Sequence, residues 1–241
     1  MIHIYNDILK AKRENIKLLA ILLDPDKIDL KTIDELVSKI NQSPATHIFI
    51  GGSLVITNIL DELIATIKET CSLPIVLFPG NPSQISDQAD AILFLSLISG
   101  RNPDFLIGHQ VAAAPIIKKT KLEVISTGYM IIESGSTTAV EAVSKTKPLP
   151  RDNFDYAVAT AQASEMLGNK LIYLEAGSGA KLAVPLQMIN LVAQNIAIPL
   201  IVGGGIADLK GIQSAYEAGA DLVVIGTAFE NDIHFFEMNA N

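Results

Sequence analysis

The feature of this sequence that most limits its fold is a series of short segments made almost entirely of apolar residues. Eight such segments occur, at residues 18–23, 47–50, 74–78, 91–97, 123–132, 171–174, 199–202 and 222–225. Apolar runs without polar alternation are typical of parallel strands that are buried on both faces. Several of them end directly in Gly, Asp, Ser or Pro, so polar and glycine chemistry lies at the carboxyl ends of the predicted strands.

Stretches with helical periodicity separate most of these segments. We predict helices at residues 5–15, 30–40 (after an Asp29 N-cap), 53–68, 102–118, 152–168, 184–194, 208–218 and 231–238. Residues 81–90 form a short segment with a proline, where little helix is expected, and residues 133–150 form the longest irregular stretch. A long loop after a strand often closes over a site, although a tolerated insertion is the alternative.

This alternation predicts an α/β fold with a parallel sheet. Eight units in 241 residues, without a break in composition, match a single (β/α)8 TIM barrel over residues 1–241, with a shortened or irregular third helix. A doubly wound open sheet is the alternative. Its dinucleotide-binding form carries a G-x-G-x-x-G turn after the first strand, where this chain has Asp24-Pro25-Asp26-Lys27.

Charge and composition narrow the classes of partner. The formal net charge of −8 and the pI near 5.0 argue against a nucleic-acid partner and against a generally basic membrane-binding surface. No apolar run approaches the ~18 residues of a spanning helix and no signal peptide is recognisable, so we expect a cytoplasmic protein with at most peripheral membrane contact. A single cysteine, Cys71, excludes an intrachain disulfide. The four histidines, His3, His47, His109 and His234, show no metal-ligand spacing, and we interpret all four as structural.

The strongest chemical signal is a pair of glycine-rich turns after the last two predicted strands. Gly203-Gly204-Gly205 follows the seventh and Gly226-Thr227 follows the eighth. In a (β/α)8 barrel these two loops commonly bind phosphate, because glycine lets backbone N–H groups approach an anion. Gly177-Ser178-Gly179 after the sixth strand adds a third set of donors. The alternative is that these glycines only permit tight turns.

Charged side chains follow the first strand, in the stretch Asp24-Pro25-Asp26-Lys27. Two carboxylates and an ammonium suit a Mg²⁺–diphosphate site, since Mg²⁺ binds through one or two carboxylates plus substrate phosphates. An Asp cap on the following turn is an equal alternative. A Schiff base on Lys27 is less favoured because it needs a desolvated amine. Ser53, after Gly51-Gly52, is a candidate metal ligand, phosphate donor or helix cap.

Tyr173 and Glu175 end the sixth strand two positions apart, so both point to the same, inward face. A glutamate at the mouth of a barrel can accept hydrogen bonds from hydroxyl groups or act as a general base. A structural ion pair inside the barrel is the alternative.

Taken together, these stretches resemble the geranylgeranylglyceryl phosphate synthases and their bacterial heptaprenylglyceryl phosphate synthase relatives. The resemblance runs in order along nearly the whole chain, and its most distinctive parts are Ser99-Gly100-Arg101-Asn102 and Tyr173-Leu174-Glu175-Ala176-Gly177-Ser178-Gly179-Ala180. The loop at residues 147–151 is similar to that of the larger, oligomeric group of the family. The resemblance therefore also implies a homo-oligomer.

The resemblance implies a prenyltransferase. The family joins sn-glycerol 1-phosphate to a polyprenyl diphosphate, here expected to be geranylgeranyl diphosphate, with Mg²⁺ as cofactor and release of diphosphate. By match, Asp24 and Ser53 would hold the metal, Asp24 and Glu175 would be catalytic, and glycerol phosphate would bind at Tyr173, Leu174, Glu175, Ala176, Gly177, Ser178, Gly179, Gly204, Gly205, Gly226 and Thr227. An apolar trough for the prenyl chain is expected near Leu95, Leu97, Ile98, Tyr129 and Ile131.

Two other functions remain possible from the residues alone. A sugar-phosphate isomerase or aldolase would use the same phosphate loops, with Lys27 as the obvious candidate amine. A non-enzymatic barrel would keep the glycines but would give no reason for Asp24, Ser53 and Glu175 to converge.

Overall fold

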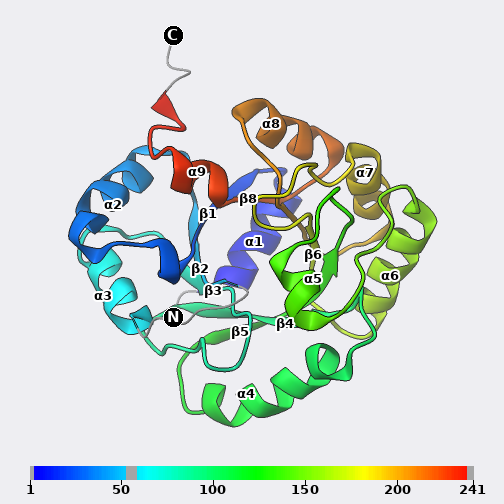
Figure 1. The fold of residues 1–241 in the computed structure, drawn as a ribbon, viewed down its shortest axis with the longest axis horizontal. Helices are drawn as coiled ribbons and strands as arrows, with labels where there is room; N and C mark the ends of the chain where they lie inside the picture. Colours follow the sequence, from blue (N-terminus) through cyan, green and yellow to red (C-terminus); the bar gives the residue numbers. More distant parts are fainter. Residues whose placement is uncertain (1–2, 53–58, 238–241) are drawn as a thin grey trace.

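Eight parallel strands close into a barrel in the order of the sequence, as predicted (Figure 1). The computed structural model describes residues 3–52 and 59–237. The strands are β1 (Leu18–Leu23), β2 (His47–Ile50), β3 (Ile75–Leu77), β4 (Ala91–Leu97), β5 (Glu123–Ile131), β6 (Leu171–Glu175), β7 (Leu200–Gly203) and β8 (Leu222–Ile225). Pairing of Leu18 with Leu222 and of Ile21 with Ile225 joins the first strand to the last and excludes the open sheet.

Side chains alternate between the inside of the barrel and the surrounding helices. The interior cluster includes Ala20, Phe49, Val76, Leu93 and Tyr173, and a second cluster lies between the strands and the helices. The amino-terminal end of the barrel is covered by α1 (Ile4–Arg13), which crosses the middle of the ring in Figure 1. Its buried residues Ile4 and Ile8 belong to the interior cluster.

The outer helices are α2 (Ile33–Gln42), α3 (Leu60–Thr70), α4 (His109–Ile117), α6 (Phe154–Met166), α7 (Leu186–Asn195) and α8 (Leu209–Ala218). As expected, no helix lies between β3 and β4, and turns and irregular segments connect these two strands. The long loop after β5 contains the short helix α5 (Ala139–Ser144), capped by the Thr138 side chain. None of the described helices is long and apolar enough to cross a membrane.

Helix boundaries differ from the prediction by one or two residues in several helices, and more clearly in the following places. Asp29 caps a single 3-10 turn, η2 (Leu30–Thr32), and α2 begins after it. A π-helical turn, η3 (Asp104–Gly108), precedes α4. Of the helix predicted over residues 53–68, residues 53–58 lie outside the described part of the chain, and α3 begins at Leu60.

The prediction of a last helix over residues 231–238 was wrong. The helix of this segment is α9 (Thr227–Asn231), which starts directly after β8. The next residues form turns, and Phe235 and Phe236 fold back so that the Phe236 ring lies 6.1 Å from that of Phe229. The apolar spacing of this segment therefore reflects packing of a turn onto α9 rather than the face of a longer helix.

Candidate active site

Three aromatic rings lie together inside the carboxyl-terminal mouth of the barrel. The ring centroids of Phe78, Tyr129 and Tyr173 lie 5.2–5.7 Å from one another. They come from the end of β3, from β5 and from β6. These rings form an apolar layer directly below the loops in which the polar residues were predicted.

Glu175 ends β6 and faces inward above this layer, as the two-residue spacing predicted. Its side chain is buried, and its Oε1 accepts a hydrogen bond of 2.6 Å from the backbone N–H of Gly177. Burial raises the pKa of Glu175 to about 7, although the N–H of Gly177 acts in the opposite direction. No salt bridge among the described residues includes Glu175, which counts against a structural ion pair.

Tyr173 brings a second polar group to the same point. Its hydroxyl is buried next to the Glu175 carboxylate, without the geometry of a hydrogen bond, and has no hydrogen-bond partner within the described residues. Burial, the largest cause, and the neighbouring Glu175 carboxylate raise the pKa of Tyr173 well above 10, so the phenol stays protonated. A hydroxyl group of a bound ligand would give the phenol a partner of regular geometry.

The glycine loops after β6 and β7 meet beside Glu175. Gly204 has a φ of +79°, and a Cβ at this position would lie 2.3 Å from Glu175 Oε1 and 2.5 Å from the N of Gly177. Gly177 has a φ of +104°, and a Cβ there would lie 2.3 Å from the Thr138 methyl group. Only glycine fits this close approach of two loops, and no other residue type could keep the backbone of Gly204 so near the carboxylate.

The loop after β8 completes this side of the mouth. The hydroxyl groups of Ser178 and Thr227 lie 3.1 Å apart and are within hydrogen-bond distance, so the β6 and β8 loops meet as predicted. A Cβ at Gly226, at the start of α9, would make only ordinary 3.5 Å contacts with Leu22. Its φ of −126° and ψ of −84° lie outside the α and β regions, so the backbone rather than the space around it favours glycine here.

Two of the predicted substrate-binding residues face away from the mouth. Leu174 and Ala176 are buried in the cluster between the strands and the outer helices. Their side chains therefore cannot touch a ligand in the barrel mouth, and their contribution is limited to the backbone.

Asp24 follows β1, next to the loop after β8, and caps a 3-10 turn, η1 (Pro25–Lys27). Its Oδ1 accepts a hydrogen bond of 3.1 Å from the N–H of Asp26. A Cβ at Gly52 would lie 3.1–3.2 Å from the Asp24 carboxylate, which places that carboxylate over the end of β2. Burial, the largest cause, raises the pKa of Asp24. The cap predicted as an alternative is thus present, and a quarter of the side chain remains exposed.

The donor set around Asp24 fits a magnesium ion that is held mainly by substrate. No group of three or more His, Cys, Asp or Glu side chains that could hold a metal occurs within residues 3–52 and 59–237. Mg²⁺ needs only one or two carboxylates when phosphate oxygens and water supply the rest. Ser53, the second predicted ligand, lies outside the described residues.

Lys27 does not meet the requirements of a Schiff-base lysine. Its ammonium lies 2.7 Å from Glu230 Oε2 and 3.9 Å from Asp24 Oδ2, and its side chain is 46% exposed. A Schiff-base lysine needs a desolvated amine, whereas this side chain is half exposed and ion-paired. This geometry counts against the aldolase alternative.

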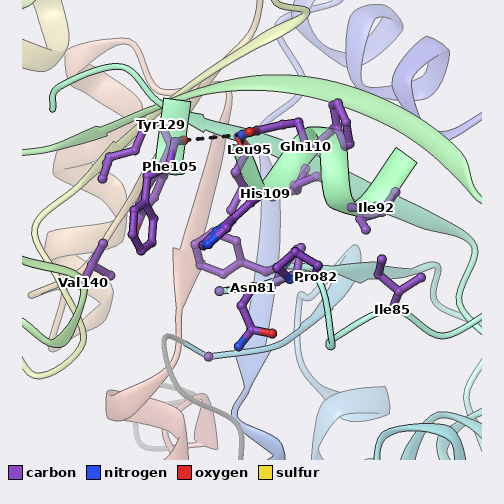
Figure 2. A pocket seen from close by; sticks show the side chains of 18 of the residues that line it. Asn81, Pro82, Ile85, Ile92, Leu95, Phe105, His109, Gln110, Tyr129 and Val140 are labelled. Carbon is purple, nitrogen blue, oxygen red and sulfur yellow. Dashed lines mark hydrogen bonds between the residues drawn. The ribbon is translucent and has the colours of Figure 1, made fainter. Parts of the chain in front are cut away.

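An apolar pocket opens from the same mouth and runs along the inner side of α4 (Figure 2). It measures about 820 Å³, including the part open to solvent. Phe78 and Tyr129 border it at the mouth, Pro82 and Ile85 line it where the third helix is missing, and Ile117 lies at the end of α4. The missing helix therefore leaves room for an elongated apolar ligand.

The predicted trough was partly right. Leu95, Leu97 and Tyr129 line the pocket, whereas Ile98 and Ile131 do not. The sequence reasoning missed a set of residues brought in by the η3 turn, α4 and α5, namely Phe105, His109, Gln110, Ala113 and Val140. A signal was present in the sequence, since residues 109–117 are apolar almost all round.

Gln110 ties α4 to the barrel wall, since its Nε2 donates to the Leu95 carbonyl oxygen (Figure 2). The ring of His109, predicted to be structural, packs on Phe105 with centroids 4.5 Å apart and lines the pocket. His47 has the structural environment predicted for it. It is buried, its Nδ1 lies 2.8 Å from the Thr46 hydroxyl, and burial lowers its pKa to about 4.

A closed (β/α)8 barrel with glycine-lined loops after β6, β7 and β8 and an apolar pocket at the same mouth defines a phosphate-binding barrel enzyme with a lipid-sized cavity. Comparison with known proteins gives the family. A sequence profile of the PcrB family matches residues 6–240, and the chain belongs to this family.

The similar proteins agree with this assignment. The chain is 69% identical to the geranylgeranylglyceryl phosphate synthase of Flavobacterium johnsoniae over 97% of its length and 96% of the relative. It is 49% identical to the enzyme of the same name from Chitinophaga pinensis, over 95% of this chain and 91% of the relative. The crystal structure of (S)-3-O-geranylgeranylglyceryl phosphate synthase from Thermoplasma acidophilum, in complex with sn-glycerol-1-phosphate, matches with a TM-score of 0.92 at 34% identity, covering 98% and 95% of the two chains.

Proposed function

We propose that this chain is a prenyltransferase that joins sn-glycerol 1-phosphate to a polyprenyl diphosphate, with geranylgeranyl diphosphate as the expected donor. The oxygen of the 3-hydroxyl group forms a bond to the allylic carbon, the bond from that carbon to the diphosphate breaks, and diphosphate leaves with the electron pair. The family and its geranylgeranylglyceryl phosphate synthases support this class of enzyme.

The observation that carries the proposal is that two different sites open at the same mouth of the barrel. One is a polar cup, formed by Tyr173, Glu175 and the loops after β6, β7 and β8, and the other is the apolar pocket. Glu175 and the unpartnered Tyr173 hydroxyl lie in the cup, and Tyr129 packs on Tyr173 while lining the pocket. A small hydroxylated anion and a long apolar chain can therefore meet at this point. Neither an isomerase nor an aldolase acting on a sugar phosphate needs such a pocket.

In this proposal each side of the cup has a separate task. The loops at Gly177, Ser178 and Gly179, at Gly204 and Gly205, and at Gly226 and Thr227 bind the phosphate through backbone N–H and hydroxyl groups. Tyr173 and Glu175 bind the glycerol hydroxyl groups, and the Glu175 carboxylate takes the proton of the attacking 3-hydroxyl. The complex of the Thermoplasma acidophilum relative with sn-glycerol-1-phosphate supports this choice of acceptor.

Asp24 and Ser53 are proposed as the Mg²⁺ ligands. The bound ion would neutralise charge on the leaving diphosphate. The N–H of Asp26 holds the Asp24 carboxylate over Gly52, at the end of the strand that leads to Ser53. This arrangement keeps a hard oxygen ligand at the rim without a dedicated metal cage.

The test is direct synthesis. Purified protein would be incubated with Mg²⁺, labelled sn-glycerol 1-phosphate and prenyl diphosphates of several lengths, and the lipid would be extracted. We expect label in an acid-stable ether lipid and an equal amount of free diphosphate, with sn-glycerol 3-phosphate as the control acceptor. Absence of an ether product with every donor would overturn the proposal. Covalent trapping of a sugar phosphate on Lys27 by borohydride would instead support an aldolase.

A further inference from the structure

Two charged side chains that the proposed function leaves unused lie next to Asp24. They are Lys27, at the end of η1, and Glu230, in α9. Glu230 is the centre of this group, because its Oε2 accepts a hydrogen bond of 2.7 Å from Lys27 Nζ and its Oε1 accepts one of 3.2 Å from the backbone N–H of Asp24. The two partners are 203 and 206 residues away along the chain.

The burial of these groups shows which of them can meet a ligand. The Glu230 side chain is 10% exposed and both of its oxygens are engaged, whereas the Lys27 side chain is 46% exposed. A lysine ammonium has three donors, and Glu230 accepts only one of them. Glu230 is therefore placed to hold the lysine, and Lys27 is placed to bind an anion.

The anion that fits is the leaving diphosphate. Lys27 Nζ lies 3.9 Å from Asp24 Oδ2, so an anion bound next to Asp24 lies within reach of the ammonium. Lys27 is the cation among these three side chains. Without it, the carboxylates of Asp24 and Glu230 would repel a diphosphate bound beside them. A compact ammonium is a common partner of phosphate oxygens.

We propose that Lys27 binds the diphosphate group of the prenyl donor, and that Glu230 is a positioning residue that fixes the Lys27 ammonium beside Asp24. This inference rests on the proposed function. Glu230 is needed because Lys27 also borders a polar depression that contains the carboxylates of Asp29 and Glu35. Once released from Glu230, the ammonium would turn towards these carboxylates or pair with Asp24, and in both cases it would bind diphosphate less well.

Calorimetry with inorganic diphosphate and Mg²⁺ tests this inference without turnover. We expect K27M to weaken binding of diphosphate roughly 10- to 100-fold, the loss of one hydrogen bond between charged groups, and K27R to restore most of it. E230Q keeps an oxygen for the Asp24 N–H but loses the charge that holds the ammonium, so we expect a loss of about tenfold. Binding of sn-glycerol 1-phosphate should change little in all three variants.

The double variant K27M/E230Q separates positioning from general stability. If Glu230 acts through Lys27, the double variant binds diphosphate as K27M does. Additive losses, or wild-type diphosphate binding by K27M or E230Q, would overturn the inference, as would equal losses for diphosphate and sn-glycerol 1-phosphate.

Because Lys27 is half exposed, K27M and K27R test the inference even if E230Q does not fold. A wild-type protein that binds Mg²⁺-diphosphate but makes no ether lipid would contradict the proposed function alone.

Discussion

Glu175 combines a buried carboxyl group, a raised pKa and a neighbouring hydroxyl without a partner. Such a carboxyl can take a proton near neutral pH, and a positioned general base contributes roughly 10²- to 10⁴-fold to a rate. We expect Glu175→Gln to lower turnover by about this factor, with a modest change in the KM of glycerol phosphate. Because the base form is populated above the pKa of about 7, wild-type activity should rise with pH through this range, and the variant should lack that rise. Near-wild-type turnover by the variant would make the carboxylate structural.

The same raised pKa predicts an effect on stability. The folded protein binds the Glu175 proton more tightly than the unfolded chain, so this contribution is complete below about pH 4.5 and is lost as the pH rises through about 7. Glu175→Gln carries no charge. We therefore expect it to raise the free energy of unfolding by about 1–3 kcal/mol at pH 8, and by less at pH 5. Urea unfolding at the two pH values measures the difference, and an equal effect at both would contradict the prediction.

Asp24 allows the two substrates to be separated. We expect Asp24→Ala to abolish most activity and to leave the affinity for sn-glycerol 1-phosphate nearly unchanged, because the loops at Gly177 and Gly204 that surround Glu175 follow β6 and β7 rather than β1. Asp29→Ala is the matched control, since Asp29 caps the next 3-10 turn in the same way. Calorimetry measures both variants. Loss of glycerol phosphate binding with normal Mg²⁺ dependence would show that the assignment of Asp24 is wrong.

At the scale of the elements, the loops after β6, β7 and β8 make different demands on their glycines. Gly204 and Gly179 both have a positive φ, of +79° and +66°, but a Cβ at Gly179 would meet nothing within 4 Å. Gly204→Ala should therefore unfold at a clearly lower temperature than Gly179→Ala, which has only the backbone cost of about 1 kcal/mol. Thermal unfolding measures both, and equal Tm values would refute the close approach of the loops at Gly204.

Gly226 gives the complementary case. A Cβ there makes only ordinary contacts, but a φ of −126° with a ψ of −84° is unfavourable for other residues, so Gly226→Ala should fold with a modest loss of stability. Its side chain should nevertheless keep an anion from the loop, so we expect binding of sulfate and sn-glycerol 1-phosphate to fall at least tenfold. Crystals soaked in sulfate show whether the anion lies at this loop. Unchanged binding by a folded variant would place the phosphate elsewhere.

All eight strands could be predicted from the sequence, because a strand that is buried on both faces consists of a continuous run of apolar residues. The inward direction of Tyr173 and Glu175 also followed from the alternation of a strand. The end of the chain was predicted less well, since Phe229, Phe235 and Phe236 have helical spacing but pack as a helix and a turn. Partners such as Lys27 and Glu230 were beyond prediction, because a contact across more than 200 residues leaves no local pattern.

For the molecule as a whole, the turn η3 and the helix α4 have an unusual outer surface. Ile107 of η3 is 59% exposed, and Val111 and Ile116 of α4 are 66% and 47% exposed. A helix that is apolar all round is usually covered on both sides. We propose that a second copy of the chain covers this surface, in the homo-oligomer that the family resemblance implies.

We therefore expect Val111→Glu to give a species of lower mass than the wild type by light scattering. Lys210→Glu, at an exposed position of α8, is the control and should leave the mass unchanged. A wild type that is already monomeric, or a variant with unchanged mass, would show that α4 is not the interface.

The pairing of β1 with β8 has a consequence for how the protein is made. Because Leu18 pairs with Leu222, and Asp24 is held by Glu230, a ribosome must translate almost the whole chain before the ring can close. Until then the two outermost strands of the partial sheet expose unpaired N–H and C=O groups, which other chains can pair with. Contacts this distant in sequence also slow folding. The nascent chain is therefore most open to pairing with other chains just before β8 leaves the exit tunnel.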